Sequence, residues 1–226
     1  MSDEAAVSYR GILFDFDGTL ADTMEGNYRA WQHVLHEAGA DINREEYFLL
    51  EGMKLAEVAR TLCEKHGVSV SDYGAVARRK EDRYAISEGG FLPYSGVESF
   101  LKAFSLAGIP MAIVTAGLRD RIIRTAPAEF LARFKSVVTG EMTERNKPFP
   151  DPYLKAAEEI GVPIRACIVV ENAPLGIRSA KAAGAFCVAI TSTLDARLLA
   201  EADVVIPRFA DLVDLPILRS MLQSSL

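Results

Sequence analysis

The hydrophobic pattern of the chain has two periods, and their order predicts the fold. Short apolar runs typical of buried strands recur at residues 11–14, 110–115, 136–138, 167–170, 185–190 and 203–206. From residue 91 onward these runs alternate with segments of helical spacing, at residues 97–107, 120–134, 151–160, 175–183, 195–201 and 209–212. Alternating strands and helices build a parallel sheet with helices on both faces. The pattern therefore predicts an α/β fold with a doubly wound parallel sheet.

Residues 23–90 interrupt this alternation. Helical spacing alone fills residues 24–38, 43–50, 55–66 and 71–88, and no strand is evident before Gly89 and Gly90 break the pattern. A stretch of this length is within the usual range for a small domain. We therefore predict an all-helical domain over residues 23–90, inserted into an α/β core made of residues 1–22 and 91–226.

Composition narrows the class of protein. Of the 226 residues half are apolar, which is enough for a sizeable core, and the net charge of −6 argues against nucleic acid as a partner. The three cysteines (Cys63, Cys167 and Cys187) are too widely spaced for a zinc site or a disulfide framework. Residues 1–9 lack the apolar core of a signal peptide, and no apolar run is long enough to span a membrane. We expect a cytoplasmic monomer or homodimer that binds neither nucleic acid nor membrane.

The first predicted strand ends in two carboxylates. Asp15 and Asp17 follow the apolar run of residues 11–14 and precede Gly18. Carboxylates at the end of a buried strand are costly unless they bind a metal or take part in chemistry, and ligands of open α/β sheets bind at the carboxyl ends of strands. Our hypothesis is that Asp15 attacks a phosphorus atom and that Asp17 moves the proton. The alternative is a pair of ordinary turn aspartates.

Further polar residues follow other strands or lie in loops between them. They are Thr115, Ala116 and Gly117 after the second strand, Glu171 and Asn172 after a later one, and Lys147 in a Pro-rich loop. Phosphoryl transfer needs a nucleophile, a cation, hydrogen-bond donors for the phosphate and a proton shuttle. These positions supply one of each.

Four motifs in this order resemble those of the haloacid dehalogenase superfamily of phosphohydrolases. They are Asp-Phe-Asp-Gly-Thr-Leu at residues 15–20, Val114-Thr115, Lys147-Pro148, and Val-Val-Glu-Asn at residues 169–172. The branch that contains β-phosphoglucomutase and phosphoglycolate phosphatase is the most similar, and the resemblance covers nearly the whole chain. It implies a Rossmann-like core with an inserted helical cap domain.

The resemblance implies a role for each motif. Asp15 would be the nucleophile that forms an aspartyl-phosphate, and Asp17 would protonate the leaving oxygen and later deprotonate water. Thr115 would bind the phosphate, and Lys147 would bring positive charge to it. Mg²⁺ prefers oxygen ligands. The implied ligands are Asp15, the backbone carbonyl of Asp17, and the pair Glu171 and Asn172.

Substrate contacts are implied for two groups of residues. In the core these are Gly18 and the backbone N–H groups of Ala116 and Gly117; in the cap they are Glu51, whose loop would face the aspartates, and Lys80, which would contact substrate phosphate. Taken alone, each motif also has an ordinary interpretation. Thr115 could cap a turn, Lys147 could be a solvated loop lysine, Glu171 and Asn172 could be turn residues, Glu51 could end a helix, and Lys80 could lie on a solvated helix face.

The chain departs from the branch at three positions. Asn172 replaces a common aspartate, which predicts weaker Mg²⁺ binding or an altered preference for highly charged substrates. Leu55 replaces the arginine with which the mutase grips a second phosphate, and Asn27 replaces a mutase histidine. We therefore predict a Mg²⁺-dependent phosphatase for a small phosphorylated metabolite of the phosphoglycolate or sugar phosphate type, with pyrophosphate also open. A phosphomutase and a catalytically silent regulatory protein are the alternatives, and a dehalogenase is disfavoured because its chemistry does not require Asp17 as an acid.

Overall fold

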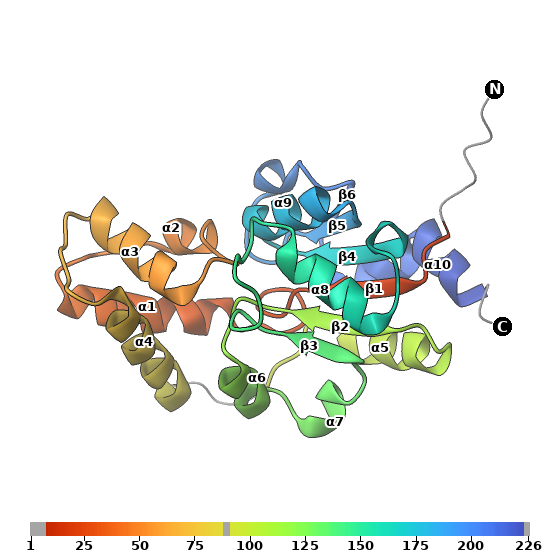
Figure 1. Cartoon of the computed structure of the whole chain (residues 1–226), viewed down its shortest axis with the longest axis horizontal. Helices are drawn as coiled ribbons and strands as arrows, with labels where there is room; N and C mark the ends of the chain where they lie inside the picture. The colour runs from red at the N-terminus through yellow and green to blue at the C-terminus, as the bar shows by residue number, and fades with distance from the viewer. Residues whose placement is uncertain (1–7, 88–90, 224–226) are drawn as a thin grey trace.

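The centre of the molecule is one parallel sheet. The computed structural model describes residues 8–87 and 91–223, and its strands lie in the order β3-β2-β1-β4-β5-β6, all parallel (Figure 1). The strands are β1 (Gly11–Phe14), β2 (Met111–Val114), β3 (Ser136–Val138), β4 (Cys167–Glu171), β5 (Phe186–Ile190) and β6 (Val204–Ile206). This order is that of a Rossmann fold, whose ligands bind where the strand order reverses beside β1. The predicted fold class is confirmed.

Alternating side chains of the strands build two apolar layers, one on each face of the sheet. Leu13 of β1 is in register with Val169 of β4 and points to one layer, whereas Phe14 and Val170 point to the other. Helices cover both layers because parallel strands need crossover connections. All four residues of β1 are buried, so the strand runs through the core and ends at the polar residues that follow it.

The core helices follow the predicted segments, except for the last helix of the chain, which was not predicted. They are α5 (Val97–Leu106), α6 (Arg119–Thr125), α7 (Ala128–Leu131), α8 (Asp151–Ile160), α9 (Pro174–Ala183) and α10 (Pro216–Gln223). Helices α8 and α9 pack on the layer that contains Leu13, and α5, α6, α7 and α10 pack on the layer that contains Phe14. Pro127 separates α6 from α7, as its lack of an N–H and its fixed φ favour.

Four helices between β1 and α5 form what we call the helical insertion. They are α1 (Met24–Glu37), α2 (Arg44–Phe48), α3 (Leu55–Lys65) and α4 (Tyr73–Ser87). Helix α4 packs against α1 and α3, and the fully buried Trp31 lies against Tyr47 in their shared core. Because the chain leaves the sheet at the carboxyl end of β1, the insertion lies beyond that edge of the sheet (Figure 1). The boundaries of residues 23–90 as a domain stay a prediction.

Two predicted helices need correction, and two elements were not predicted. Residues 195–201 and 209–212 form 3₁₀ turns, η2 (Ala196–Leu199) and η3 (Phe209–Asp214), rather than α-helices, because each segment is too short to propagate a helix. Helix α10 and the short turn η1 (Ile164–Ala166) were not predicted. The end of the predicted helix at Glu88 and the break at Gly89 and Gly90 lie outside the described residues.

Two predictions from composition can be compared with the structure. All three cysteines are free and buried, which confirms that no disulfide framework is present. No helix within residues 8–87 and 91–223 is long and apolar enough to cross a membrane. The location of the protein in the cell stays a prediction.

Candidate active site

The two aspartates after β1 lie at the buried end of the sheet, where Asp15 is only 2% exposed. The Asp15 N–H donates to the carbonyl of Val170, so the residue continues the pairing of β1 with β4. Its Oδ1 accepts a hydrogen bond from Lys147 Nζ (2.6 Å). Its Oδ2 is buried and has no hydrogen-bond partner among the described residues. Buried polar atoms are almost always bonded, so this oxygen marks a place for a ligand.

Lys147 joins three strand ends. Its Nζ donates to Asp15 Oδ1 and Glu171 Oε1 (both 2.6 Å) and to the carbonyl of Val114 (3.2 Å), which uses all three of its donors. Burial alone would lower the pKa of Lys147, but the charges of Asp15 and Glu171 raise it, so the ammonium stays charged. With 3% of Lys147 exposed, the alternative of a solvated loop lysine is wrong.

Glu171 is held by four protein donors. Oε1 accepts from Lys147 and from the Tyr153 hydroxyl (2.7 Å), and Oε2 accepts from the backbone N–H groups of Asn172 (2.9 Å) and Ala173 (3.2 Å). Helix α9 makes room for the carboxylate at Gly176, where a Cβ would lie 1.7 Å from Oε1. Glu171 therefore fixes Lys147, and in this arrangement both of its oxygens are occupied.

The environment of Asp15 opposes its ionisation, and Lys147 offsets this only in part. Burial raises the pKa of Asp15 well above its usual range, and the charges of Glu171 and Glu51 raise it further. The Lys147 charge and hydrogen bond act in the opposite direction. Lys147 is therefore the contact that most favours the ionised form of this buried carboxyl.

Asp17 faces the helical insertion and binds an arginine. Arg121 of α6 donates from Nη1 to Asp17 Oδ1 (2.8 Å) and from Nη2 to Oδ2. Thr23 Oγ1 (2.6 Å) and Asn27 Nδ2 (3.3 Å) also donate to Oδ1, and Thr115 Oγ1 lies 3.5 Å from Oδ2. Burial alone would raise the pKa of Asp17, but Arg121 and the Thr23 hydroxyl hold it below its usual value.

Lys80 brings a second cation from α4. It is 1% exposed, donates to Asn27 Oδ1 and to Glu81 Oε1 (2.8 Å), and lies 5.6 Å and 5.3 Å from the ring centroids of Trp31 and Tyr84. Burial lowers the pKa of Lys80. The alternative of a solvated helix face is therefore wrong for this residue.

The loop before α3 closes over the site. Gly52, with a φ of +96°, lies so near Lys147 that a Cβ would approach its side chain to 2.8 Å. The neighbouring Glu51 accepts from the Tyr47 hydroxyl (2.9 Å), and burial together with the Asp17 charge raises the pKa of Glu51 to about 7. The loop thus lies near Asp17, as the family resemblance implies.

The predicted phosphate loop follows β2. Thr115 Oγ1 accepts from the backbone N–H of Gly117 (3.0 Å), so Thr115 does cap this turn, and it also faces Asp17. Ala116 and Gly117 are buried beside it. The turn therefore places a hydroxyl and backbone N–H groups at the same edge as Asp15, an arrangement suited to an anion.

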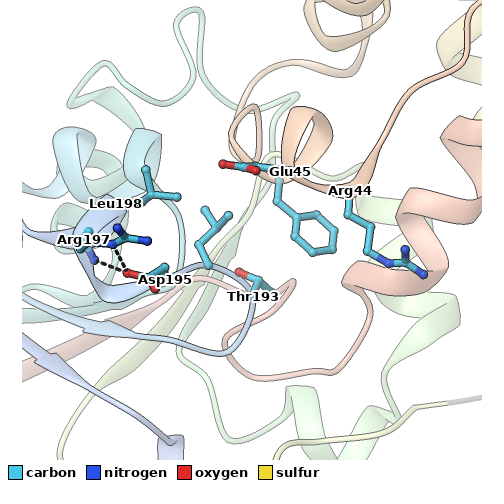
Figure 2. Close-up of a pocket in the computed structure, with 8 residues that line it drawn as sticks. Arg44, Glu45, Thr193, Asp195, Arg197 and Leu198 are labelled. Atoms are coloured by element: carbon cyan, nitrogen blue, oxygen red, sulfur yellow. Dashed lines mark hydrogen bonds and ion pairs between the residues drawn. The ribbon is translucent and has the colours of Figure 1, made fainter.

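Several hollows lie between the helical insertion and the core, and two of them bear on the site. Asp17, Lys80, Arg121 and Glu51 help to line an internal cavity of about 20 Å³, which has room for about one water molecule. A larger groove of about 560 Å³ lies between α2 and the loop after β5, where Figure 2 shows Arg197 bonded to Asp195. Arg44, the other arginine of that groove, is ion-paired with Glu25. The small cavity, which is lined by Asp17, is the candidate substrate site in a closed form.

Comparison with known proteins agrees with this geometry. The family model for haloacid dehalogenase-like hydrolases matches residues 12–190. The chain belongs to this family. It is 32% identical over 197 residues to hexitol phosphatase A of Escherichia coli K12, covering 87% of this chain and 90% of that protein. It is 31% identical over 206 residues to validoxylamine A 7′-phosphate phosphatase of Streptomyces hygroscopicus subsp. limoneus, covering 88% and 93%.

A solved structure extends the match over the helical insertion. A protein from Bacteroides vulgatus, proposed to be a β-phosphoglucomutase, superposes with a TM-score of 0.83 at 27% identity, covering 98% of this chain and 92% of that structure. The predicted family and the predicted reaction class are both confirmed: the chain is a haloacid dehalogenase-like hydrolase of phosphate esters.

The hydrolase offers oxygen ligands for a divalent cation, although no group of three His, Cys, Asp or Glu side chains within the described ranges is arranged to hold one. The carboxylates of Asp17 and Glu171 are already bound by Arg121 and Lys147. The unpartnered Asp15 Oδ2 and the Asn172 side chain remain, and both offer hard oxygen. The donor set therefore fits Mg²⁺ through Asp15 and Asn172, and it gives Glu171 no spare oxygen.

Asn172 is held by threonines on both sides. Thr19 Oγ1 donates to its Oδ1 (3.0 Å), and its Nδ2 donates to Thr193 Oγ1 (3.0 Å). Gly18 permits this placement, because it has a φ of +85° and a Cβ there would lie 2.3 Å from Asn172 Nδ2. The glycine is thus explained by the turn and by the amide packed against it.

Sequence reasoning missed several charged or hydroxyl groups of the site, among them Arg121, Glu81 and Tyr153. Arg121 lies four residues after Gly117, in the helix that leaves the phosphate loop, and this spacing is the one signal that could have found it. Glu81 is adjacent to Lys80 in a charged run that reads as a solvated face. Asn27 was considered only as a departure from the mutase, yet it bonds both Asp17 and Lys80.

Proposed function

We propose that the chain is a Mg²⁺-dependent phosphatase that hydrolyses a small phosphorylated polyol or sugar through an aspartyl-phosphate. The observation that carries the proposal is the buried, unpartnered Oδ2 of Asp15, beside the cation of Lys147. This oxygen is positioned by the end of β1 and lacks a bond that a phosphoryl group would supply. The same edge of the sheet holds the donors of the phosphate loop.

Mg²⁺ would be held by Asp15, the backbone carbonyl of Asp17 and Asn172. When bound, such an ion neutralises the charge of the phosphate oxygens. Glu171 would then act on Lys147 rather than on the ion, because its oxygens accept four protein hydrogen bonds. Lys147 favours the ionised form of Asp15 in a site where burial favours the neutral acid.

The reaction divides into two displacements at phosphorus. An Asp15 oxygen forms a bond to phosphorus as the ester P–O bond breaks, and Asp17 gives its proton to the leaving oxygen. A water molecule then loses a proton to Asp17 and attacks the phosphorus, which releases phosphate and restores the Asp15 carboxylate. Thr115 and the N–H groups of Ala116 and Gly117 hold the phosphate oxygens during both steps.

The substrate class follows from the cavity lining and the relatives. Both anionic and cationic side chains line the cavity: Asp17 and Glu51 on the one hand, Lys80 and Arg121 on the other. Such a lining suits a body with several hydroxyl groups, which both donate and accept hydrogen bonds. The two curated relatives described above are phosphatases of a hexitol phosphate and of validoxylamine A 7′-phosphate.

The mutase alternative is less well supported. Leu55, which stands where the mutase carries an arginine, lines the cavity with an apolar side chain. Asn27 is occupied by Asp17 and Lys80. We propose that residues 23–90 act as a cap that opens to admit substrate, because the closed cavity is smaller than any sugar phosphate.

The test is a panel of phosphate esters assayed for phosphate release with and without Mg²⁺. The panel contains hexitol and hexose phosphates, phosphoglycolate and pyrophosphate. We expect hexitol or hexose phosphate to be hydrolysed fastest, and Asp15→Asn to lower kcat at least about a thousandfold. Asp41→Asn, at an exposed loop residue, is the matched control.

Three outcomes would change the assignment. Full activity in Asp15→Asn would exclude the aspartyl-phosphate. Conversion of hexose 1-phosphate to hexose 6-phosphate without phosphate release would identify a mutase. If pyrophosphate alone were hydrolysed, the substrate would be a diphosphate rather than a polyol or sugar phosphate.

A further inference from the structure

Arg121 is buried between two carboxylates that belong to different parts of the chain. Its Nη atoms bind both oxygens of Asp17, which follows β1, and its Nε lies 3.6 Å from Oε2 of Glu81 in α4. Arg121 is 5% exposed, Glu81 is 6% exposed, and α4 and α6 lie near one another in Figure 1. The guanidinium therefore lies at the junction of the helical insertion and the core.

The pairing with Asp17 blocks the role proposed for that residue. An acid and base must reach the leaving oxygen of the substrate and then a water molecule. Here a planar guanidinium takes both Asp17 oxygens, and the cavity beside them has room for about one water molecule. Arg121 must leave Asp17 before a proton can move.

A second partner for Arg121 is already in place. Among residues 8–87 and 91–223, Arg121 Nε and Glu81 Oε2 are both buried without a hydrogen-bond partner. The other Glu81 oxygen is bound by Lys80, so Oε2 alone is open to the arginine. A small movement of the guanidinium would turn a 3.6 Å approach into a charge-assisted hydrogen bond.

Gly117 leaves the space in which the guanidinium lies. A Cβ at this position would be 2.2 Å from Arg121 Nη2 and 3.0 Å from its Cζ. The guanidinium therefore packs on the backbone of the phosphate loop itself. A phosphate ester that enters this loop competes for the same space, so substrate binding would push Arg121 away from Asp17.

We propose that Arg121 is a positioning residue that changes partner from Asp17 to Glu81 when substrate binds. In the closed arrangement of the structure, Arg121 binds the carboxylate of Asp17, the proposed acid and base. In the substrate complex it pairs with Glu81, which frees Asp17 and ties α4 to α6 over the substrate. The inference rests on the proposed function, since it assigns a consequence to the proton transfer by Asp17.

A double-mutant cycle on Glu81 and Arg121 tests this exchange. Glu81→Gln removes the second partner, so Arg121 stays on Asp17 in a larger share of substrate complexes. We expect kcat to fall about tenfold with KM changed less than about threefold. In the Arg121→Met background, where no arginine can occupy Asp17, Glu81→Gln should leave kcat within about twofold.

The controls separate this exchange from folding and from the proposed function. Thermal melting checks each variant, and Arg121→Lys, which cannot bind both Asp17 oxygens at once, replaces Arg121→Met if that variant does not fold. Arg178→Met, at an exposed ion pair with Glu201, is the matched control. Multiplicative effects of the two substitutions, or an unchanged kcat in Glu81→Gln, would overturn the exchange. Activity retained in Asp15→Asn would instead overturn the proposed function.

Discussion

The site has two halves that differ in how they are held. The half around Asp15 belongs to the core alone, where Lys147 and Glu171 have their donors and acceptors filled by strand ends and by Tyr153. The half around Asp17 is shared between the core and the helical insertion. There Arg121 Nε and Glu81 Oε2 are buried without hydrogen bonds to any described residue.

This difference separates what must stay fixed from what must move. A nucleophile attacks along one line, so a carboxylate with one oxygen held by Lys147 and the other left without a protein partner suits the role proposed for Asp15. An acid and base must be exposed to substrate and then to water, so contacts that can be exchanged suit the role proposed for Asp17. The two unsatisfied atoms on the Asp17 side, Arg121 Nε and Glu81 Oε2, belong to charged groups that lie 3.6 Å from each other.

The largest expected effect comes from removing Lys147, which holds the half of the site around Asp15. Lys147→Met removes the cation between Asp15 and Glu171 and leaves two buried carboxylates facing each other. We expect kcat to fall at least about a thousandfold and the free energy of unfolding to fall by about 3 kcal/mol, because uncompensated buried charge is strongly destabilising. Steady-state kinetics and thermal melting measure the two effects.

The control for this variant is Lys155→Met, which removes an ion pair with Glu159 on the surface of α8. It should change kcat and stability little, because exposed pairs contribute about 0–1 kcal/mol. If Lys147→Met kept activity within about tenfold of the native chain, the lysine would not be needed to favour the ionised form of Asp15. The claim that Lys147 holds the half of the site around Asp15 would then be wrong.

The sequence predicted most of the fold because strands and core helices carry local signals. The run of residues 11–14 has no polar residue, and α8 has Pro152 in its first turn, so each element could be placed from its own composition. The 3₁₀ turns η2 and η3 and the missed helix α10 are short or peripheral, and their form depends on packing against the sheet.

The two halves of the site were unequally predictable for the same physical reason. Asp15 and Glu171 lie at strand ends, so a prediction of parallel strands also predicts that they meet, and the Lys147-Pro148 motif adds Lys147 through the family resemblance. Arg121 and Glu81 lie on helix faces that read as solvated, and 40 residues of chain (121 − 81) separate them. Their contact depends on how the helical insertion packs on the core, which no local pattern encodes.

A smaller effect is expected at Asn172, which is a proposed Mg²⁺ ligand in the half of the site around Asp15. Asn172→Asp adds a charge beside Asp15 at the proposed Mg²⁺ site, and the Thr19 hydroxyl can still donate to the new carboxylate. We expect the Mg²⁺ concentration for half-maximal activity to fall about tenfold, because affinity rises with the charge of the ligands. Activity titrated with Mg²⁺ measures the change.

The matched control for this substitution is Asn43→Asp, at the N-terminal cap of α2, where aspartate caps as well as asparagine. It should leave the Mg²⁺ titration unchanged. An identical titration for native chain and Asn172→Asp would remove Asn172 from the metal site. The amide would then serve only to hold the turn at Gly18 through Thr19 and Thr193.

The smallest expected effect is at Glu51, in the half of the site around Asp17. Burial and the Asp17 charge raise the pKa of Glu51 from 4.5 to about 7, so the folded chain binds a proton there in a pH range where the unfolded chain does not. The contribution of Glu51 to stability is therefore greatest below pH 4.5 and is lost as the pH rises through about 7. Near pH 8 the buried charge is a net cost.

Glu51→Gln mimics the protonated acid, keeps an acceptor for the Tyr47 hydroxyl and removes that cost. We expect the variant to be about 1 kcal/mol more stable than the native chain near pH 8 and equally stable near pH 5. Urea unfolding at the two pH values measures the difference, with the exposed Glu45→Gln of α2 as control. A gain in stability of equal size at both pH values would show that the charge of Glu51 is not its cause. The buried Glu51 carboxylate in the half around Asp17 would then carry no net cost.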